Sequence, residues 1–338
     1  MQAFHSVGLL ASRHQRFFVT MALAISCATP AWAQVQGAGS TLARSLMAAW
    51  AEQYGAVVGG VSYEAQGSSM GVSRATEQSV DFGVTDVAMT AVALRQAGLK
   101  QVPLAATAVA VVVNLPELAG RPLRLNADIL ADIYQGTITQ WNHSQIAGNN
   151  PGLVLPARAI VPLWRADGSG QSFVFSTYLS RGNSKWRRLI SSTSNLQLTA
   201  GKGVRGGQAL IDAVKATPGG VAYESVAGAR ASGLPIAELQ NAAAKYIAPT
   251  SAAVDQALGA ANWAADNNAA DLDGSAGAGA YPMAAITYAL IPAVPKTGRK
   301  SANAFFTQAL TQGDAAVQKA GFNTLPATGK TMALALVR

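Results

Sequence analysis

Four short segments of the chain combine glycines with hydroxyl or carboxylate side chains, at points where a helix is expected to begin or a strand to end. They are Gly37–Thr41, Gly67–Gly71, Asp81–Asp86 and Arg165–Gln171. The first turn of a helix carries free N–H groups and a partial positive charge. Glycines let a ligand approach the backbone closely, and hydroxyl groups add donors. Several such segments that converge would enclose a small oxyanion, and Arg165 would add a bidentate charged contact.

Asp86 restricts which oxyanion such a site accepts. Phosphate near neutral pH keeps at least one proton, so it can donate a hydrogen bond to a carboxylate. Sulfate has no proton to donate and would leave the carboxylate unpaired and repelled. Sites built around a hydrogen bond of this kind can reject an analogue lacking it by roughly 10⁴–10⁵. The segment therefore favours phosphate over a fully deprotonated anion.

Each segment taken alone also has an ordinary structural explanation. Ser and Thr before a helix are common N-caps, and Asp167–Gly170 has the composition of a surface turn. Aspartates such as Asp86 are most often solvated. The four segments together indicate an anion binder and no more than that.

The N-terminus has the pattern of an export signal. Arg13, His14 and Arg16 precede the apolar stretch Phe17–Ala24, and small residues end the segment at Ala33. This order predicts a signal peptide, residues 1–33, cleaved after Ala33. The apolar stretch is shorter than the about 20 residues that span a bilayer.

Bulk composition describes the mature chain. Cleavage would leave 338 − 33 = 305 residues, which suits two domains. Removing Arg13 and Arg16 changes the net charge from +8 to +8 − 2 = +6, and only 12% of residues are charged, which is too little for a nucleic-acid surface. The single cysteine, Cys27, lies in the signal, so the folded domain has no disulfide. Lipid anchoring at Cys27 is an alternative to cleavage after Ala33.

Short apolar runs alternate with amphipathic stretches along the mature chain. The predicted strands are Val61–Glu64, Leu104–Asn114, Ile160–Leu163 and Gly220–Tyr223. The predicted helices are Thr41–Tyr54, Val72–Gln78, Asn126–Tyr134, Ser172–Leu179, Gln208–Ala216, Val254–Ala265 and Ala302–Thr311. This alternation predicts an α/β fold with a sheet covered on both faces.

The four segments, in this order and spacing, resemble the periplasmic phosphate-binding proteins of phosphate ABC importers, the PstS family. Further matches cover nearly the whole mature chain. They are Asp132–Gly136 with Trp141, Asn150–Leu153, Arg165–Phe175, Gly219–Tyr223, Tyr281–Pro282 and Thr287–Ile291.

The resemblance implies the type II periplasmic-binding-protein fold, an α/β fold with two lobes and two crossover strands as the hinge. Lobe 1 would be residues 34–103 plus 281–338, and lobe 2 residues 104–280. The family's phosphate contacts fall on Thr41, Leu42 (through its backbone N–H), Ser68, Asp86, Arg165, Ser169, Gly170 and Gln171. Asp167 would brace Arg165. The resemblance implies a periplasmic monomer that binds inorganic phosphate and delivers it to an ABC permease with a cytoplasmic ATPase, with no catalytic residue, cofactor or metal.

The chain departs from the family pattern at a few positions. The family usually has Thr where this chain has Gln171, whose amide could donate in place of the hydroxyl but is longer. Leu42 replaces an aromatic residue, Met70 replaces a second glycine, and Trp164 stands where a basic residue can occur. These departures put the affinity in question.

Two kinds of alternative function remain. Gly67–Gly71 fits the G-x-S-x-G pattern of a hydrolase with Ser69 as nucleophile, but His143 is the only histidine of the mature chain that could serve as base. Scattered acids with one histidine do not suit a metal-dependent phosphatase. The closer alternative is a protein of the same fold that binds another oxyanion, such as a phosphonate, a phosphate ester or sulfate. A secreted phosphate scavenger that no longer serves a transporter is also compatible with the sequence.

Overall fold

A long mixed sheet forms the centre of the protein. A computed structural model describes residues 34–263, 267–270, 272 and 277–338. The described strands of this sheet follow the order β2-β1-β3-β11-β4-β8-β6-β7. Their bounds are β1 Val35–Gly39, β2 Val61–Ala65, β3 Phe82–Thr85, β4 Leu99–Val113, β6 Val161–Arg165, β7 Lys202–Val204, β8 Gly220–Ser225 and β11 Ala284–Pro292.

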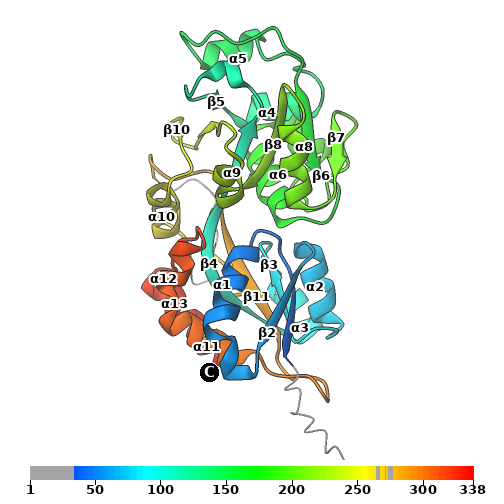
Figure 1. Cartoon of the computed structure of the whole chain (residues 1–338), viewed down its shortest axis with the longest axis vertical. Coiled ribbons are helices and arrows are strands. Elements are labelled where there is room, and N and C mark those ends of the chain that lie inside the picture. Colours follow the sequence, from blue (N-terminus) through cyan, green and yellow to red (C-terminus); the bar gives the residue numbers. More distant parts are fainter. Residues whose placement is uncertain (1–33, 264–266, 271, 273–276) are drawn as a thin grey trace, which may run out of the picture. The chain divides into compact units, whose positions relative to one another are not determined.

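Two strands connect the halves of the sheet. β4 runs antiparallel to β11 from Leu99, opposite Pro292, to Ala108, opposite Ala284. Beyond Ala108 it pairs with β8 instead, over Val109–Val113. Nearly every residue of β4 and all of β11 are buried, which explains their apolar composition. Figure 1 shows β4 and β11 extending between the strands β1–β3 and the strands β6–β8.

Helices cover the sheet, as the alternating pattern predicts. Among them, α2 packs on β1 and β3, α8 on β6 and β8, α6 on β8, and α13 on β4. The helix bounds are α1 Arg44–Tyr54, α2 Ser68–Thr76, α3 Ala91–Ala97, α4 Ala127–Tyr134, α5 Ser144–Asn149, α6 Gly170–Gly182, α7 Ser184–Leu189, α8 Gly207–Lys215, α9 Val226–Ser232, α10 Ser251–Gly259, α11 Asn303–Gln312, α12 Asp314–Lys319 and α13 Ala327–Val337. A small separate sheet contains β5 Arg124–Leu125, β9 Glu238–Gln240 and β10 Tyr246–Ile247.

The predicted strands and helices are all found, with shifted ends. The helix predicted at Val72–Gln78, for example, begins four residues earlier at Ser68 and ends at Thr76. Gly67 makes this early start possible because its φ of 109° turns the chain sharply out of β2. The helix predicted at Val254–Ala265 is α10, which ends at Gly259; the last two predicted positions lie outside the described residues.

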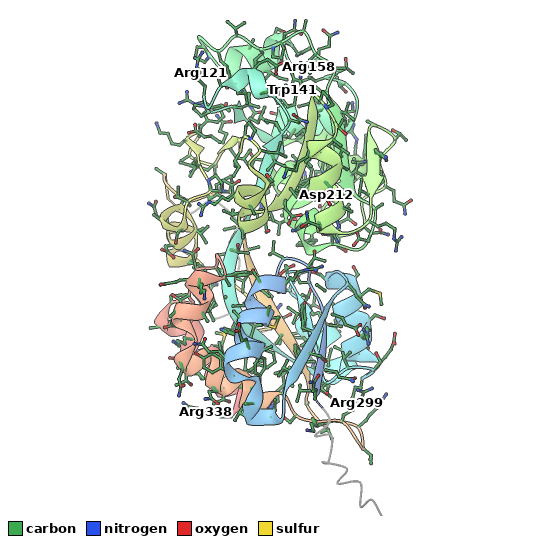
Figure 2. The ribbon with its side chains drawn as sticks, viewed as in Figure 1. Arg121, Trp141, Arg158, Asp212, Arg299 and Arg338 are labelled. Carbon is green, nitrogen blue, oxygen red and sulfur yellow. The ribbon has the colours of Figure 1, made fainter. Side chains whose placement is uncertain are left out.

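The structure bears differently on the predicted signal peptide, the predicted lobe boundary and Trp141. The predicted signal peptide lies outside the described residues. The predicted boundary between Pro103 and Leu104 falls inside β4, where the pairing with β11 shifts register: Thr287 pairs with Ala105 and Tyr288 with Pro103. The two-lobe division remains a prediction. Trp141 is fully buried and donates from Nε1 to the Gly219 carbonyl at 3.0 Å (Figure 2). None of the described helices combines the length and the hydropathy needed to cross a membrane.

Candidate functional site

The first group of candidate residues lies where three neighbouring strands end. β1 pairs with both β2 and β3 in parallel, so the carboxyl ends of these strands meet at one edge of the sheet. Ser40 and Thr41 follow β1, Ser68 follows β2 after a two-residue turn, and Asp86 follows β3. This edge therefore collects two hydroxyl segments and a carboxylate from distant parts of the chain.

The second group lies at the ends of another set of parallel strands. β6 pairs in parallel with β7 and β8. Arg165 is the last residue of β6, and Glu224 is the next-to-last residue of β8. Ser169 is the N-cap of α6, where its Oγ accepts from the N–H of Ser172 at 3.4 Å. Gly170 and Gln171 form the first turn of α6, whose free N–H groups suit an anion.

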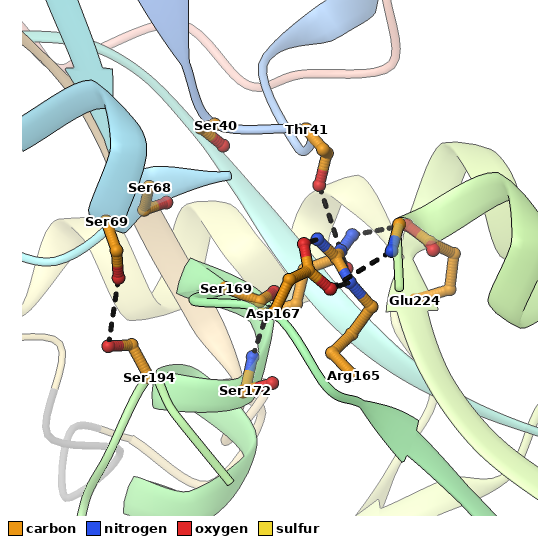
Figure 3. A network of polar contacts seen from close by, with 12 residues as sticks. Ser40, Thr41, Ser68, Ser69, Arg165, Asp167, Ser169, Ser172, Ser194 and Glu224 are labelled. Carbon is orange, nitrogen blue, oxygen red and sulfur yellow. Dashed lines mark hydrogen bonds and ion pairs between the residues drawn. The ribbon is translucent and has the colours of Figure 1, made fainter. Parts of the chain in front are cut away.

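The two groups face each other at close range (Figure 3). Arg165 Nη1 donates to Thr41 Oγ1 at 3.0 Å, and the Ser69 N–H donates to the Gly168 carbonyl at 3.4 Å. Gly170 permits this approach: a Cβ on it would lie 2.6 Å from Ser68 Oγ and closer still to the Asp86 carboxylate. The structure thus brings together all eight predicted contact residues, with Leu42 placed beside Thr41. The Leu42 side chain is buried in the core.

Asp86 is a buried acceptor surrounded by hydroxyl donors. Its Oδ2 accepts from Ser40 Oγ and, at 3.0 Å, from Ser68 Oγ, and its Oδ1 accepts from Thr287 Oγ1 at 2.8 Å. Burial raises the pKa of Asp86, while these hydrogen bonds and the charge of Arg165 partly offset the rise.

Arg165 is the cation of the site and is fully buried. Asp167 accepts from Nε at 2.7 Å and from Nη2, and Gln171 Oε1 accepts from Nη1 at 3.0 Å. Burial acts to raise the pKa of Asp167, but hydrogen bonds from Arg165 and the Gly206 N–H outweigh burial and lower it. Asp167 therefore stays ionised and holds the guanidinium plane, as the resemblance implied.

Gln171 is held at both ends of its amide. Its Oε1 accepts from Arg165, and its Nε2 donates to Glu224 Oε1. Glu224 is 6% exposed, and its Oε1 also accepts from the Ser225 N–H at 2.7 Å. The side chain of Gln171 thus links the arginine to a second buried carboxylate.

Three residues of the site escaped prediction from the sequence. Ser40 lies within the predicted segment Gly37–Thr41, in which the resemblance gives the neighbouring Thr41 as the phosphate contact. Thr287 and Glu224 come from β11 and β8 and reach the site only through the fold. Both interrupt runs of apolar residues in buried strands. Thr287 also begins the family-like segment Thr287–Ile291, and Glu224 directly follows Gly219–Tyr223.

The hydrolase alternative finds no support in the described geometry. Ser69 Oγ lies 3.4 Å from Ser194 Oγ, and Ser69 is exposed (Figure 3). His143 is the N-cap of α5, where its Nδ1 accepts from the Gln145 N–H. The histidine and the serine thus have separate partners. Within the described residues, no group of three or more His, Cys, Asp or Glu is arranged to hold a metal ion.

Comparison with known proteins decides the family. A model of the PBP superfamily domain matches residues 26–310. The chain is 32% identical over 300 residues to the phosphate-binding protein PstS of Xylella fastidiosa strain Temecula1, covering 87% of this chain and 82% of the relative. PstS of Pasteurella multocida is 31% identical over 313 residues, covering 91% and 90%. The chain belongs to the PstS family.

Solved structures agree on the fold. The phosphate-bound periplasmic phosphate-binding protein PfluDING matches with a TM-score of 0.69 at 20% identity, covering 90% of this chain and 93% of that one. The phosphate-binding protein of Stenotrophomonas maltophilia matches with a TM-score of 0.67 at 21% identity and the same coverage. The predicted α/β periplasmic-binding-protein fold of type II is confirmed.

Proposed function

We propose that this member of the PstS family is an exported solute-binding protein that captures inorganic phosphate and delivers it to an ABC permease driven by a cytoplasmic ATPase. One observation carries the choice of ligand. A buried carboxylate, Asp86, faces the same space as a buried arginine and the first turn of α6. Such a space suits an anion that also donates a hydrogen bond, and hydrogen phosphate is the common anion with that property.

The arginine presents two N–H groups to the ligand. Of its five N–H groups, three are held by the scaffold: two by Asp167 and one by Gln171. Two N–H groups remain. One is on Nη1 and donates to Thr41 in this structure, and the other is on Nη2. An oxyanion that replaces the Thr41 hydroxyl as acceptor would receive both in a bidentate contact.

The other contacts come from both groups. Thr41, Ser68 and the backbone of Leu42 would donate from one side, while Asp86 would accept the proton of the phosphate. Ser169 Oγ and the N–H groups of Gly170 and Gln171 would donate from α6. Helix N-termini then supply much of the positive potential, so the site needs a single cation.

Capture would be reversible and would involve no covalent chemistry. The lobes, residues 34–103 plus 281–338 and residues 104–280, would open and close about β4 and β11. Phosphate would favour the closed form because only there do both groups contact it. We expect a periplasmic monomer, with the signal removed after Ala33.

Gln171 bears on the alternative that the ligand is a phosphonate or a phosphate ester, because it replaces the family's Thr. Its amide contacts Arg165 and Glu224, so the side chain of Gln171 does not argue for a different oxyanion.

Calorimetric titration of residues 34–338, stripped of ligand, with phosphate and then with sulfate tests the proposal. We expect one-to-one binding of phosphate and no response to sulfate. A folded sample that ignores phosphate would refute the proposed function, and equal affinity for both anions would refute the role of Asp86.

A further inference from the structure

Glu224 is a buried acid of the site that the capture of phosphate, as described so far, does not use. Its Oε1 accepts from Gln171 Nε2 and from the Ser225 N–H, whereas its Oε2 is buried without a hydrogen-bond partner. A buried carboxylate oxygen without a donor is costly. An unpaired oxygen beside a binding site therefore calls for a functional explanation.

The surroundings of Glu224 contain both favourable and unfavourable influences on its charge. Arg165 of β6 faces it, and a Cβ on Gly207, the first residue of α8, would lie 2.9 Å from Oε2, so the positive end of that helix packs against it. Glu224 also lines a cavity, and two cations, Arg44 of α1 and Lys215 of α8, line that cavity with it.

The remaining neighbours are neutral or oppose the charge. Gln171 of α6 and Gly228 of α9 lie against Glu224, and neither residue carries a charge. Burial raises the pKa of Glu224, and the hydrogen bond from the Ser225 N–H and the charge of Arg165 only partly offset the rise. Burial and the neighbouring donors and charges thus act on the pKa of Glu224 in opposite directions, so a negative charge added nearby would raise this pKa further.

Phosphate would supply that added charge. The ligand would accept from the two N–H groups of Arg165 that Asp167 and Gln171 do not hold, and it would replace Thr41 as the acceptor of one of them. Arg165 is joined to Glu224 through Gln171. An anion on the far side of the guanidinium offsets the positive charge that stabilises an ionised Glu224. The repulsion between phosphate and Glu224 is relieved if Glu224 takes up a proton.

We infer that Glu224 is a positioning residue of the phosphate site, which holds Arg165 through Gln171, and that phosphate capture is accompanied by uptake of one proton at Glu224. This inference rests on the proposed function. The proton comes from bulk water and joins Oε2. Glu224 lies at the wall of a cavity of about 490 Å³ between α1, α8 and α9, which gives the proton a route.

The hydrogen bond to Gln171 survives protonation. In the neutral acid, Oε1 is the carbonyl oxygen and still accepts from Gln171 Nε2. Gln171 therefore keeps its carbonyl towards Arg165 in both states. The proton changes the charge of the site and leaves the arrangement of Arg165 intact, so the proton acts on affinity through electrostatics.

The test compares the wild-type chain with Glu224→Gln, which keeps the shape and an acceptor but cannot be charged. Phosphate affinity is measured by calorimetry between about pH 5 and pH 9, where raised carboxyl groups titrate. The ratio of the two dissociation constants is the readout, because the ionisation of phosphate and of Asp86 affects both proteins alike. Glu117→Gln, a surface acid paired with Arg158, is the matched control.

We expect wild type and Glu224→Gln to bind alike at the acid end. Towards high pH the variant should bind more tightly, by about tenfold, as expected for removal of one charge near the ligand. Titrations in buffers of different ionisation enthalpy should show proton uptake that is larger in wild type than in the variant. The Glu117→Gln control should follow wild type throughout.

The outcomes separate the inference from the proposed function. A ratio that stays constant with pH, with equal proton uptake in both proteins, overturns the proton linkage and leaves phosphate binding established. Weaker phosphate binding by Glu224→Gln than by wild type at every pH would also overturn the proton linkage. Failure of wild type to bind phosphate overturns both. Gln171→Leu, which cuts the link from Glu224 to Arg165, provides a second variant and should weaken phosphate binding at all pH values.

Discussion

Replacing Arg165 by Ala tests whether the guanidinium group or the helix ends dominate phosphate binding. The substitution removes the two N–H donors proposed to contact the ligand, the one on Nη1 that donates to Thr41 in this structure and the one on Nη2. Hydrogen bonds to charged groups contribute about 1.5–3 kcal/mol each, so the loss is about 3–6 kcal/mol. Since each 1.4 kcal/mol is about tenfold, phosphate affinity should fall by about 10²- to 10⁴-fold.

The same substitution leaves Asp167 without its main partner. Asp167 is 13% exposed, and breaking a buried pair by removing one member costs about 3–5 kcal/mol of folding stability. The unpaired carboxylate would also repel an incoming anion, which adds to the loss of affinity. The folded state of the variant therefore has to be verified by thermal unfolding before binding is measured.

Calorimetric titration with phosphate is the assay, and two further variants separate the effects. Arg165→Lys keeps the charge without the planar fork, so it should lose less affinity than the Ala variant. Arg158→Ala removes an arginine that pairs with Glu117 at the surface and should leave binding unchanged (Figure 2). A folded Arg165→Ala protein that binds phosphate within about tenfold of wild type would refute the reasoning and assign the site to its helix ends.

Three further predictions concern Asp86 and its neighbours. Asp86→Asn should reduce discrimination against sulfate, because an amide can donate to a bare oxygen; titration with sulfate checks this, and rejection as strong as in wild type would contradict it. Gly170→Ala should abolish tight binding, since its Cβ would lie 2.6 Å from Ser68 Oγ, whereas Gly148→Ala, with open space around it, should bind normally in the same titration. Thr287→Val should cost about 1–3 kcal/mol of stability by removing the donor to Asp86 Oδ1. That donor stabilises the ionised carboxylate, so its loss raises the pKa of Asp86 further; the cost should be present above that pKa and shrink as pH falls, as chemical unfolding at neutral and acid pH can show.

The sequence predicted part of the buried strand β4 but did not predict β11, which is equally buried. The run Leu104–Asn114 was recognised, but β4 begins five residues earlier at Leu99. The early part contains Gln101, whose amide is buried and bonded to the N–H of Met89 and the carbonyl of Asn267. A polar residue satisfied by tertiary contacts has the same local pattern as a loop residue, so the pattern could not extend the strand.

Strands rich in glycine were missed for a different reason. β1 contains Gly37 and Gly39, and glycine is a poor strand former. Its presence is explained by packing, since the ring of Phe82 on β3 occupies the place where a Gly37 side chain would lie, and Gly39 lies against the Val84 carbonyl. Such requirements depend on the neighbouring strand and cannot be derived from the segment itself.

The candidate site could likewise be predicted only where its residues form a local pattern. The residues predicted from the sequence lie in short segments with glycines and hydroxyls before a helix, a local pattern with a local physical reason. Thr287 is 201 positions from the acid it contacts, and Glu224 is 53 positions from Gln171. Only the order of the strands brings them together, so a single sequence could not assign them.

The balance of charge explains how such a site can select phosphate. Arg165 is surrounded by two carboxylates, Asp167 directly and Glu224 through Gln171, and Asp86 faces the ligand space itself. The ionisable side chains of the site therefore carry no excess of positive charge, and attraction for anions in general is weak. Binding has to come from N–H and O–H groups directed at fixed positions, together with one acceptor. The proton on the ligand then decides the selectivity. An anion of the same shape without a proton accepts the same hydrogen bonds but leaves Asp86 facing a bare oxygen.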